Sequence, residues 1–160
     1  MRKVTLGLLG LACVAALAFN GFGQSSNAIA DDVLAMVRAQ WAAEIKDPTN
    51  VAEQMKNIAA DYTEFNGDYA TRLEGKSLNM RLAEAGGVSS IRTVAAEMAN
   101  PKVQVYNGDV AILSYNYVGL SKDKDGKTEP SRAKSTRVYV KQNGKWMLVH
   151  ANFGADPVPK

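Results

Sequence analysis

The sequence predicts an α+β fold in which helices of the first half pack on a curved, mainly antiparallel sheet of the second half. Between residues 27 and 85, apolar residues recur at helical spacing. From about residue 90 the chain is instead rich in Val, Ile and Tyr, and tight turns separate its apolar runs. Helices followed by strands are typical of α+β domains. A strongly curved sheet with helices on its concave face would form a cone that encloses a pocket.

The N-terminus has the pattern of a secretory signal peptide. Arg2 and Lys3 precede an apolar run over residues 4–19, and small residues that suit a cleavage site follow. The run is slightly shorter than the roughly 20 apolar residues of a membrane-spanning helix, and an uncleaved anchor is the alternative. We expect export to the bacterial periplasm or the medium, with no stable membrane insertion after cleavage. The expected regions are a signal peptide at residues 1–23, a linker at 24–30 and a single domain at 31–156.

Composition excludes several classes of site. Cys13, the only cysteine, lies in the expected signal peptide, so the mature chain would have no disulfide, zinc-thiolate site or cysteine nucleophile. A single histidine excludes a His-rich metal site. Without Arg2 and Lys3 the chain has 17 basic and 16 acidic residues. It therefore lacks the excess of positive charge that is typical of nucleic-acid-binding domains. We therefore expect no metal, no cofactor and no nucleic-acid partner.

Two helices are expected before residue 63. The first begins near Asn27 and ends before Pro48, which cannot continue a helix. The second begins after Asn50, whose side chain can cap it while Glu53 completes a capping box. The buried stripe of the first helix is Val33, Leu34, Val37, Trp41 and Ile45, and that of the second is Val51, Met55, Ile58 and Tyr62.

The remaining elements are mostly strands. Residues 62–77 are expected to form two short extended pieces around a turn at Asn66 and Gly67, and a third helix follows at residues 77–85. Asn-Gly pairs at 107–108 and 143–144 are signals for tight hairpin turns, and residues 122–130 form a longer polar loop. The expected strands are residues 90–99, 102–106, 109–121, 132–142 and 145–153.

Three segments carry a family resemblance: "NPKVQVYNGDVAILSY", "KDKDGKTEPSRAKSTRVYV" and "NGKWMLVHANFG". Over residues 30 to 154 the chain resembles the nuclear transport factor 2-like superfamily. Within it, the chain is most similar to the association domain of calcium/calmodulin-dependent protein kinase and to SnoaL-like domains. The resemblance implies a cone-shaped fold whose last strands line a cavity, and a homodimer formed through the exposed sheet face.

The resemblance also marks departures at the expected cavity. In the kinase association domain, arginines from three strands meet in this cavity. Only Arg137 matches here, because Tyr117 and Phe153 occupy the other two positions. Asn152 replaces the second histidine of the terminal motif. A strong multi-arginine site for a carboxylate is therefore not implied.

Strand alternation predicts which side chains share the pocket. His150 and Asn152 share one face of the last strand, and Arg137 and Tyr139 share one face of the strand before it. An apolar box with a few polar groups is the usual composition of a small-molecule site. The interpretation requires Arg137 and His150 on the same side of the sheet. The predicted pocket residues are Arg137, His150, Asn152, Tyr115 and Tyr117, with Trp41 and Tyr62 from the helices.

Arg137 and His150 each have a structural alternative. A guanidinium that faces a core needs a partner, and Arg137 could hold a ligand carboxylate, pair with Glu97, Glu64 or Asp61, or face solvent. The imidazole of His150, the weak catalytic candidate, suits proton transfer near neutral pH but could equally be a buried neutral ring.

The sequence thus leaves three functions open. The first is an exported domain that binds a small, carboxylated or hydroxylated apolar molecule. The second is an isomerase or cyclase of the ketosteroid-isomerase or SnoaL type, in which His150, Glu97 or Asp61 abstracts a proton and Tyr115 or Tyr117 stabilises the oxyanion. The third is a non-catalytic assembly module. The fold itself does not choose among them.

Overall fold

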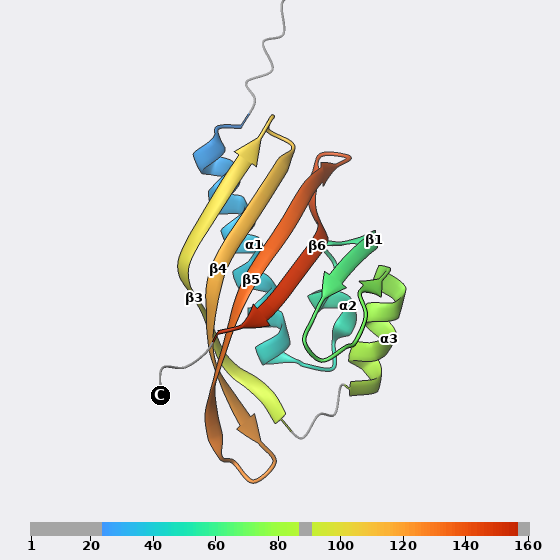
Figure 1. Cartoon of the computed structure of the whole chain (residues 1–160), viewed down its shortest axis with the longest axis vertical. Helices are drawn as coiled ribbons and strands as arrows, with labels where there is room; N and C mark the ends of the chain where they lie inside the picture. Colours follow the sequence, from blue (N-terminus) through green and yellow to red (C-terminus); the bar gives the residue numbers. More distant parts are fainter. Residues whose placement is uncertain (1–23, 87–90, 157–160) are drawn as a thin grey trace, which may run out of the picture.

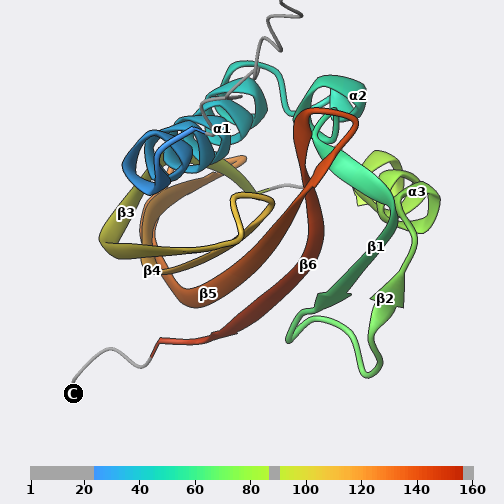
Figure 2. The same cartoon turned by 90° about the horizontal axis from the view of Figure 1, so that it is seen from above.

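The computed structural model describes residues 24–86 and 91–156. The elements are α1 (Ser26–Lys46), α2 (Val51–Gln54), β1 (Ile58–Phe65), β2 (Leu73–Glu74), α3 (Lys76–Gly86), β3 (Ile91–Tyr106), β4 (Val110–Asp123), β5 (Thr128–Gln142) and β6 (Lys145–Ala155). The strands form one curved sheet (Figure 1) of order β2-β1-β6-β5-β4-β3, in which only the β1–β6 pair is parallel. Figure 2 shows α1 lying within the curve of β3, β4 and β5. The predicted α+β cone is therefore confirmed.

The expected signal peptide, residues 1–23, lies outside the described residues. The helix α1 begins at Ser26, so residues 26–30 of the expected linker are already helical. The side chain of Ser25 caps this helix by accepting a hydrogen bond from the amide of Ala28 at 3.2 Å. Within the described ranges, no helix combines the length and hydropathy needed to cross a bilayer.

The core lies between α1 and the concave face of the sheet. Side chains spaced four residues apart along α1 point into it, from Ile29 to Trp41. Ile29 is only 1% exposed, which explains why the helix extends into the expected linker. On the sheet, alternate residues of each strand face the helix. These core residues are Ile29, Val33, Val37 and Trp41 of α1, with Ala111, Leu113, Tyr115 and Tyr139 of the sheet.

The second helix is much shorter than predicted. Asn50 caps it as expected, accepting a hydrogen bond from the amide of Glu53 at 3.2 Å. The helix ends at Gln54, however, and Ile58–Phe65 forms the strand β1 parallel to β6. Ile58 and Tyr62 are four residues apart, an even spacing that suits one face of a strand as well as a helix. Pairing with the distant β6 decides between the two, and the predicted helix through Tyr62 is wrong.

Two hairpins have the tight turns that their Asn-Gly pairs predict. The φ angles are 52° and 77° at Asn107 and Gly108, and 51° and 78° at Asn143 and Gly144. Positive φ at both central residues is the geometry that matches the twist of the flanking strands. The predicted strands 90–99 and 102–106 are one strand, β3, with an irregularity near Asn100. The long polar loop is likewise shorter, since β4 reaches Asp123 and β5 begins at Thr128.

A β-bulge in β6 sets the orientation of the last strand. Val138 of β5 pairs with His150, whereas the next residue, Tyr139, pairs with Leu148, so Val149 is an extra residue in β6. One extra residue reverses the inward and outward faces of the strand beyond it. Leu148 before the bulge and Ala151 after it therefore both face the core, at 3% and 0% exposure.

Candidate functional site

A cavity of about 200 Å³ lies between α1 and the concave face of the sheet. Trp41 packs edge-on against both Tyr115 and Tyr117, with ring centroids 5.7 and 5.4 Å apart. The cavity thus has an aromatic wall, one negatively charged side chain, Glu44, and one positively charged side chain, Arg137. Its lining is Trp41 and Glu44 from α1, Tyr115 and Tyr117 from β4, Arg137 from β5, and Phe153 from β6.

Arg137 is the buried cation of this cavity. Its side chain is 5% exposed, and its guanidinium carbon lies 5.9 Å from the ring centre of Tyr115 and 5.6 Å from that of Phe153. Nη1 donates a hydrogen bond to Oε1 of Gln40 at 2.7 Å, while Nε has no hydrogen-bond partner among the described residues.

No carboxylate of the described residues lies within 4.0 Å of Arg137. The ion pair that was one alternative for this residue is therefore not found, and neither is the solvent-facing alternative. A buried charge without a counter-ion is unfavourable, so this wall of the cavity favours an anion.

Hydroxyl groups around Arg137 stay neutral at ordinary pH. Burial raises the pKa of Tyr139, although the positive charge of Arg137 opposes the rise. Burial also raises the pKa of Tyr62, and the carboxylate of Glu64 adds to the effect. For Arg137, burial lowers the pKa, but the facing tyrosines outweigh it and the net shift is upward. A permanent cation therefore lies beside the neutral hydroxyls of Tyr62 and Tyr139.

Tyr62 lies behind the cavity wall and does not line it. Its hydroxyl donates to Oε2 of Glu64 at 2.7 Å, and Nδ2 of Asn66 donates to Oε1 of the same carboxylate at 2.9 Å. Glu64 is 8% exposed, and these two bonds satisfy it within β1 and the turn that follows. This explains why a buried glutamate on the concave face does not pair with Arg137.

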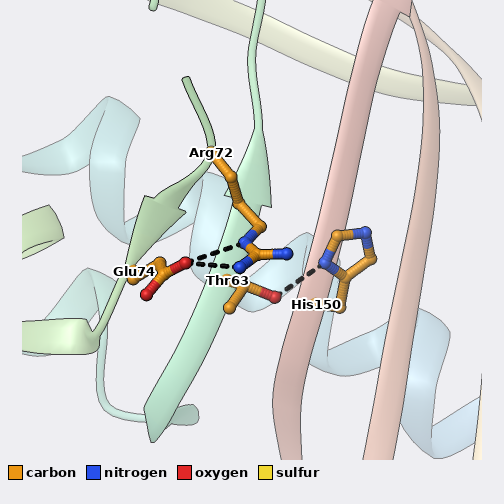
Figure 3. Close-up of polar contacts among 4 residues, drawn as sticks. All are labelled: Thr63, Arg72, Glu74 and His150. Carbon is orange, nitrogen blue, oxygen red and sulfur yellow. Dashed lines mark hydrogen bonds and ion pairs between the residues drawn. The ribbon is translucent and has the colours of Figure 1, made fainter.

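His150 and Asn152 lie on the opposite face of the sheet, so the prediction that they line the cavity is wrong. Nδ1 of His150 is 2.8 Å from Oγ1 of Thr63, and its ring meets the edge of Phe65. Figure 3 shows this contact beside the ion pair of Arg72 and Glu74. The cause is the extra residue Val149, which regular alternation cannot reveal.

The requirement that Arg137 and His150 share one side of the sheet is thus not met. The two other proposed bases, Asp61 and Glu97, are exposed and do not line the cavity. None of the three proton acceptors that the isomerase hypothesis requires lines the cavity. The described residues also contain no group of three or more His, Cys, Asp or Glu side chains that could hold a metal ion.

Four of the seven predicted pocket residues do come together: Trp41, Tyr115, Tyr117 and Arg137. The sequence interpretation missed Gln40, which binds Arg137, and Glu44, which lines the cavity. The helical spacing that predicts Trp41 to point inward contains the signal for both, because residues 37, 40, 41 and 44 lie on one helix face. The sequence interpretation considered only the apolar residues of that helix face, so it passed over the polar side chains of Gln40 and Glu44.

The fold and its cavity define a nuclear transport factor 2-like domain. Residues 36–157 match the family model of the calcium/calmodulin dependent protein kinase II association domain, and the chain belongs to this family. The predicted resemblance to the nuclear transport factor 2-like superfamily and to the kinase association domain is confirmed.

Two kinds of relative illustrate the match. The calcium/calmodulin-dependent protein kinase type II of Caenorhabditis briggsae is 28% identical over 64 residues, which are 40% of this chain and 12% of the kinase. Among solved structures, the association domain of the C. elegans kinase has a TM-score of 0.67 at 18% identity, covering 81% of this chain and 97% of that one. A nuclear transport factor 2-like protein of Salmonella enterica has a TM-score of 0.69 at 12% identity, covering 85% and 96%. At these identities the structural likeness shows the fold alone.

Proposed function

We propose that this domain binds a small carboxylate in the concave cavity, where Arg137 holds the carboxylate group. The observation that carries the proposal is a buried guanidinium at the wall of a cavity, with no carboxylate of the described residues within 4.0 Å. The proposal does not depend on His150. It replaces the predicted pair of Arg137 and His150 with Arg137 and Gln40, which are in contact.

The cavity also limits the size and polarity of the ligand. Its 200 Å³ is below the range of about 300–1,000 Å³ for drug-sized ligands, so the site suits a small molecule. Rings from Trp41, Tyr115, Tyr117 and Phe153 form much of the wall and favour an apolar body. A guanidinium presents donors in a planar fork that matches the two oxygens of a carboxylate.

Isothermal titration calorimetry with phenylacetate and its neutral analogue 2-phenylethanol tests the proposal. We expect the wild-type domain to bind phenylacetate in preference to the alcohol, and Arg137→Met to abolish the preference. Arg132→Met is the matched control, because Arg132 is an exposed arginine of the same strand. Equal binding of both compounds, or binding that survives in Arg137→Met, would refute the role of Arg137.

A second candidate function is self-association through the other face of the sheet. The chain belongs to an association-domain family, and Figure 1 looks onto a sheet face that no described element covers. This face carries Tyr106 and Val118, which are 48% and 37% exposed. Exposed apolar groups on an open sheet favour contact with another copy.

Sedimentation velocity over a dilution series tests this candidate. We expect a dimer that dissociates on dilution, and we expect Val118→Lys to weaken it. Tyr69→Lys changes a large residue of similar exposure, 41% against 37%, in the segment between β1 and β2 and serves as the control. A monomer at every concentration would exclude the candidate.

We also propose that the domain acts after export, on the basis of the signal-peptide pattern in residues 1–23. N-terminal sequencing of the protein from a bacterial host tests this. A mature chain that begins near residue 24 in the periplasm or medium is expected, and a full-length chain in the cytoplasm would contradict it.

A further inference from the structure

We infer that the ligand is a zwitterion, a small molecule that places its carboxylate at Arg137 and an ammonium group at Glu44. The inference rests on the proposed function and adds the second charge of the ligand. It names the chemical class as small amino acids whose amine is separated from the carboxylate by a carbon chain, together with their N-methylated forms.

Two residues of opposite charge line the cavity without forming an ion pair. Glu44 is a half-buried residue of α1, and Arg137 is a buried residue of β5 that reaches α1 through its hydrogen bond to Gln40. The carboxylate and the guanidinium form no ion pair within 4.0 Å. A carboxylate and a guanidinium that share a small cavity but do not pair can each bind a group of the same ligand.

The surroundings of Glu44 suit a cation. Glu44 lines the cavity together with Tyr117, and its charge helps to raise the pKa of Tyr117, after the larger effect of burial. Tyr117 in turn packs against Trp41 at 74° between ring planes, and both line the cavity. Ring faces of Trp and Tyr attract ammonium groups, and a neighbouring carboxylate strengthens the attraction.

Charge balance separates the zwitterion from simpler ligands. A plain carboxylate satisfies Arg137 but leaves Glu44 facing an apolar body, and a plain amine leaves Arg137 without an anion. A dicarboxylate would place a negative charge against Glu44. Only a molecule with one charge of each sign satisfies both residues, and burial makes an unmet charge at Arg137 costly.

Three probes of equal chain length test the inference: 5-aminopentanoate, pentanoate and pentylamine. We expect calorimetry to show that the wild-type domain binds 5-aminopentanoate at least about fivefold more tightly than pentanoate. In Glu44→Gln this preference should fall below about twofold, while pentanoate binds equally or more tightly. Asp31→Asn removes the same charge from an exposed position of α1 and should keep the wild-type preference.

The outcomes distinguish the inference from the proposed function. Equal affinity for 5-aminopentanoate and pentanoate would overturn the zwitterion and leave Arg137 as a carboxylate site. A preference that persists in Glu44→Gln would overturn the assignment of Glu44. Absence of binding for all three probes and for phenylacetate would overturn both proposals. Circular dichroism of each variant confirms that it is folded before titration.

Discussion

Replacing Arg137 with methionine should leave the stability of the free protein nearly unchanged while it removes the carboxylate site. Methionine keeps an unbranched side chain of similar length in a position that is 5% exposed. It removes a charge whose burial costs several kcal/mol. Replacing buried ion pairs with apolar residues of similar volume stabilises proteins by about 1–4 kcal/mol in known cases. An unpaired Arg137 should follow that pattern more readily than a paired one.

The losses offset most of this gain. The guanidinium gives up its hydrogen bond to Gln40, of about 1.5–3 kcal/mol for a charged donor. Gln40 is half-buried, so water replaces much of that bond. Contacts with the rings of Tyr115 and Phe153 contribute about 0.5–1 kcal/mol each. The gains and losses nearly cancel, so we expect the free energy of unfolding to change by less than about 1 kcal/mol, which corresponds to a change in Tm of less than about 5 °C for a domain of this size.

Urea unfolding of the ligand-free protein, followed by tryptophan fluorescence, measures the free energy of unfolding. Arg132→Met should change it by less than about 0.5 kcal/mol, because Arg132 is exposed. A loss of more than about 2 kcal/mol in Arg137→Met would refute the reasoning. It would mean that Arg137 is a satisfied structural residue and that the cavity does not favour an anion.

Two further predictions concern the tyrosines. In Gly119→Ala the new Cβ would lie 2.3 Å from Oη of Tyr117, so the ring must move; thermal denaturation should show a loss of about 1 kcal/mol, and ligand affinity should fall. Gly154→Ala, where no atom lies within 4 Å of the new Cβ, should lose nothing. The pKa of Tyr62 is raised above its ordinary 10.0, so the folded state binds its proton more tightly than the unfolded chain. Its contribution is present below pH 10 and is lost above it, by about 1.4 kcal/mol per pH unit. Tyr62→Phe should make the alkaline fall in unfolding free energy shallower, the exposed Tyr106→Phe should not, and identical slopes would contradict the assignment.

Local sequence signals were sufficient for the hairpins and most of the core. The Asn-Gly pairs at 107–108 and 143–144 determine tight turns through their positive φ angles, whatever the rest of the chain does. Alternation in β4 and β5 correctly placed Tyr115 and Arg137 on one face, because these strands pair without a shift between them. The aromatic wall and its cation therefore follow from the sequence.

Long-range pairing determined what the sequence did not reveal. Thr63 of β1 pairs with His150 of β6, a contact between segments that lie 87 residues apart. No periodicity within residues 50–65 shows that this partner exists, so a helix was expected there. The extra residue at Val149 is also set by pairing, since a bulge depends on the neighbouring strand as much as on its own side chains.

The bulge at Val149 holds one residue more than the neighbouring strand needs. Deleting Val149 would leave regular alternation, in which Leu148, Ala151 and Phe153 still face the core and His150 and Asn152 still face outward. A change of one residue in the length of the terminal strand can therefore be absorbed at the bulge, while the side chains that line the cavity stay the same.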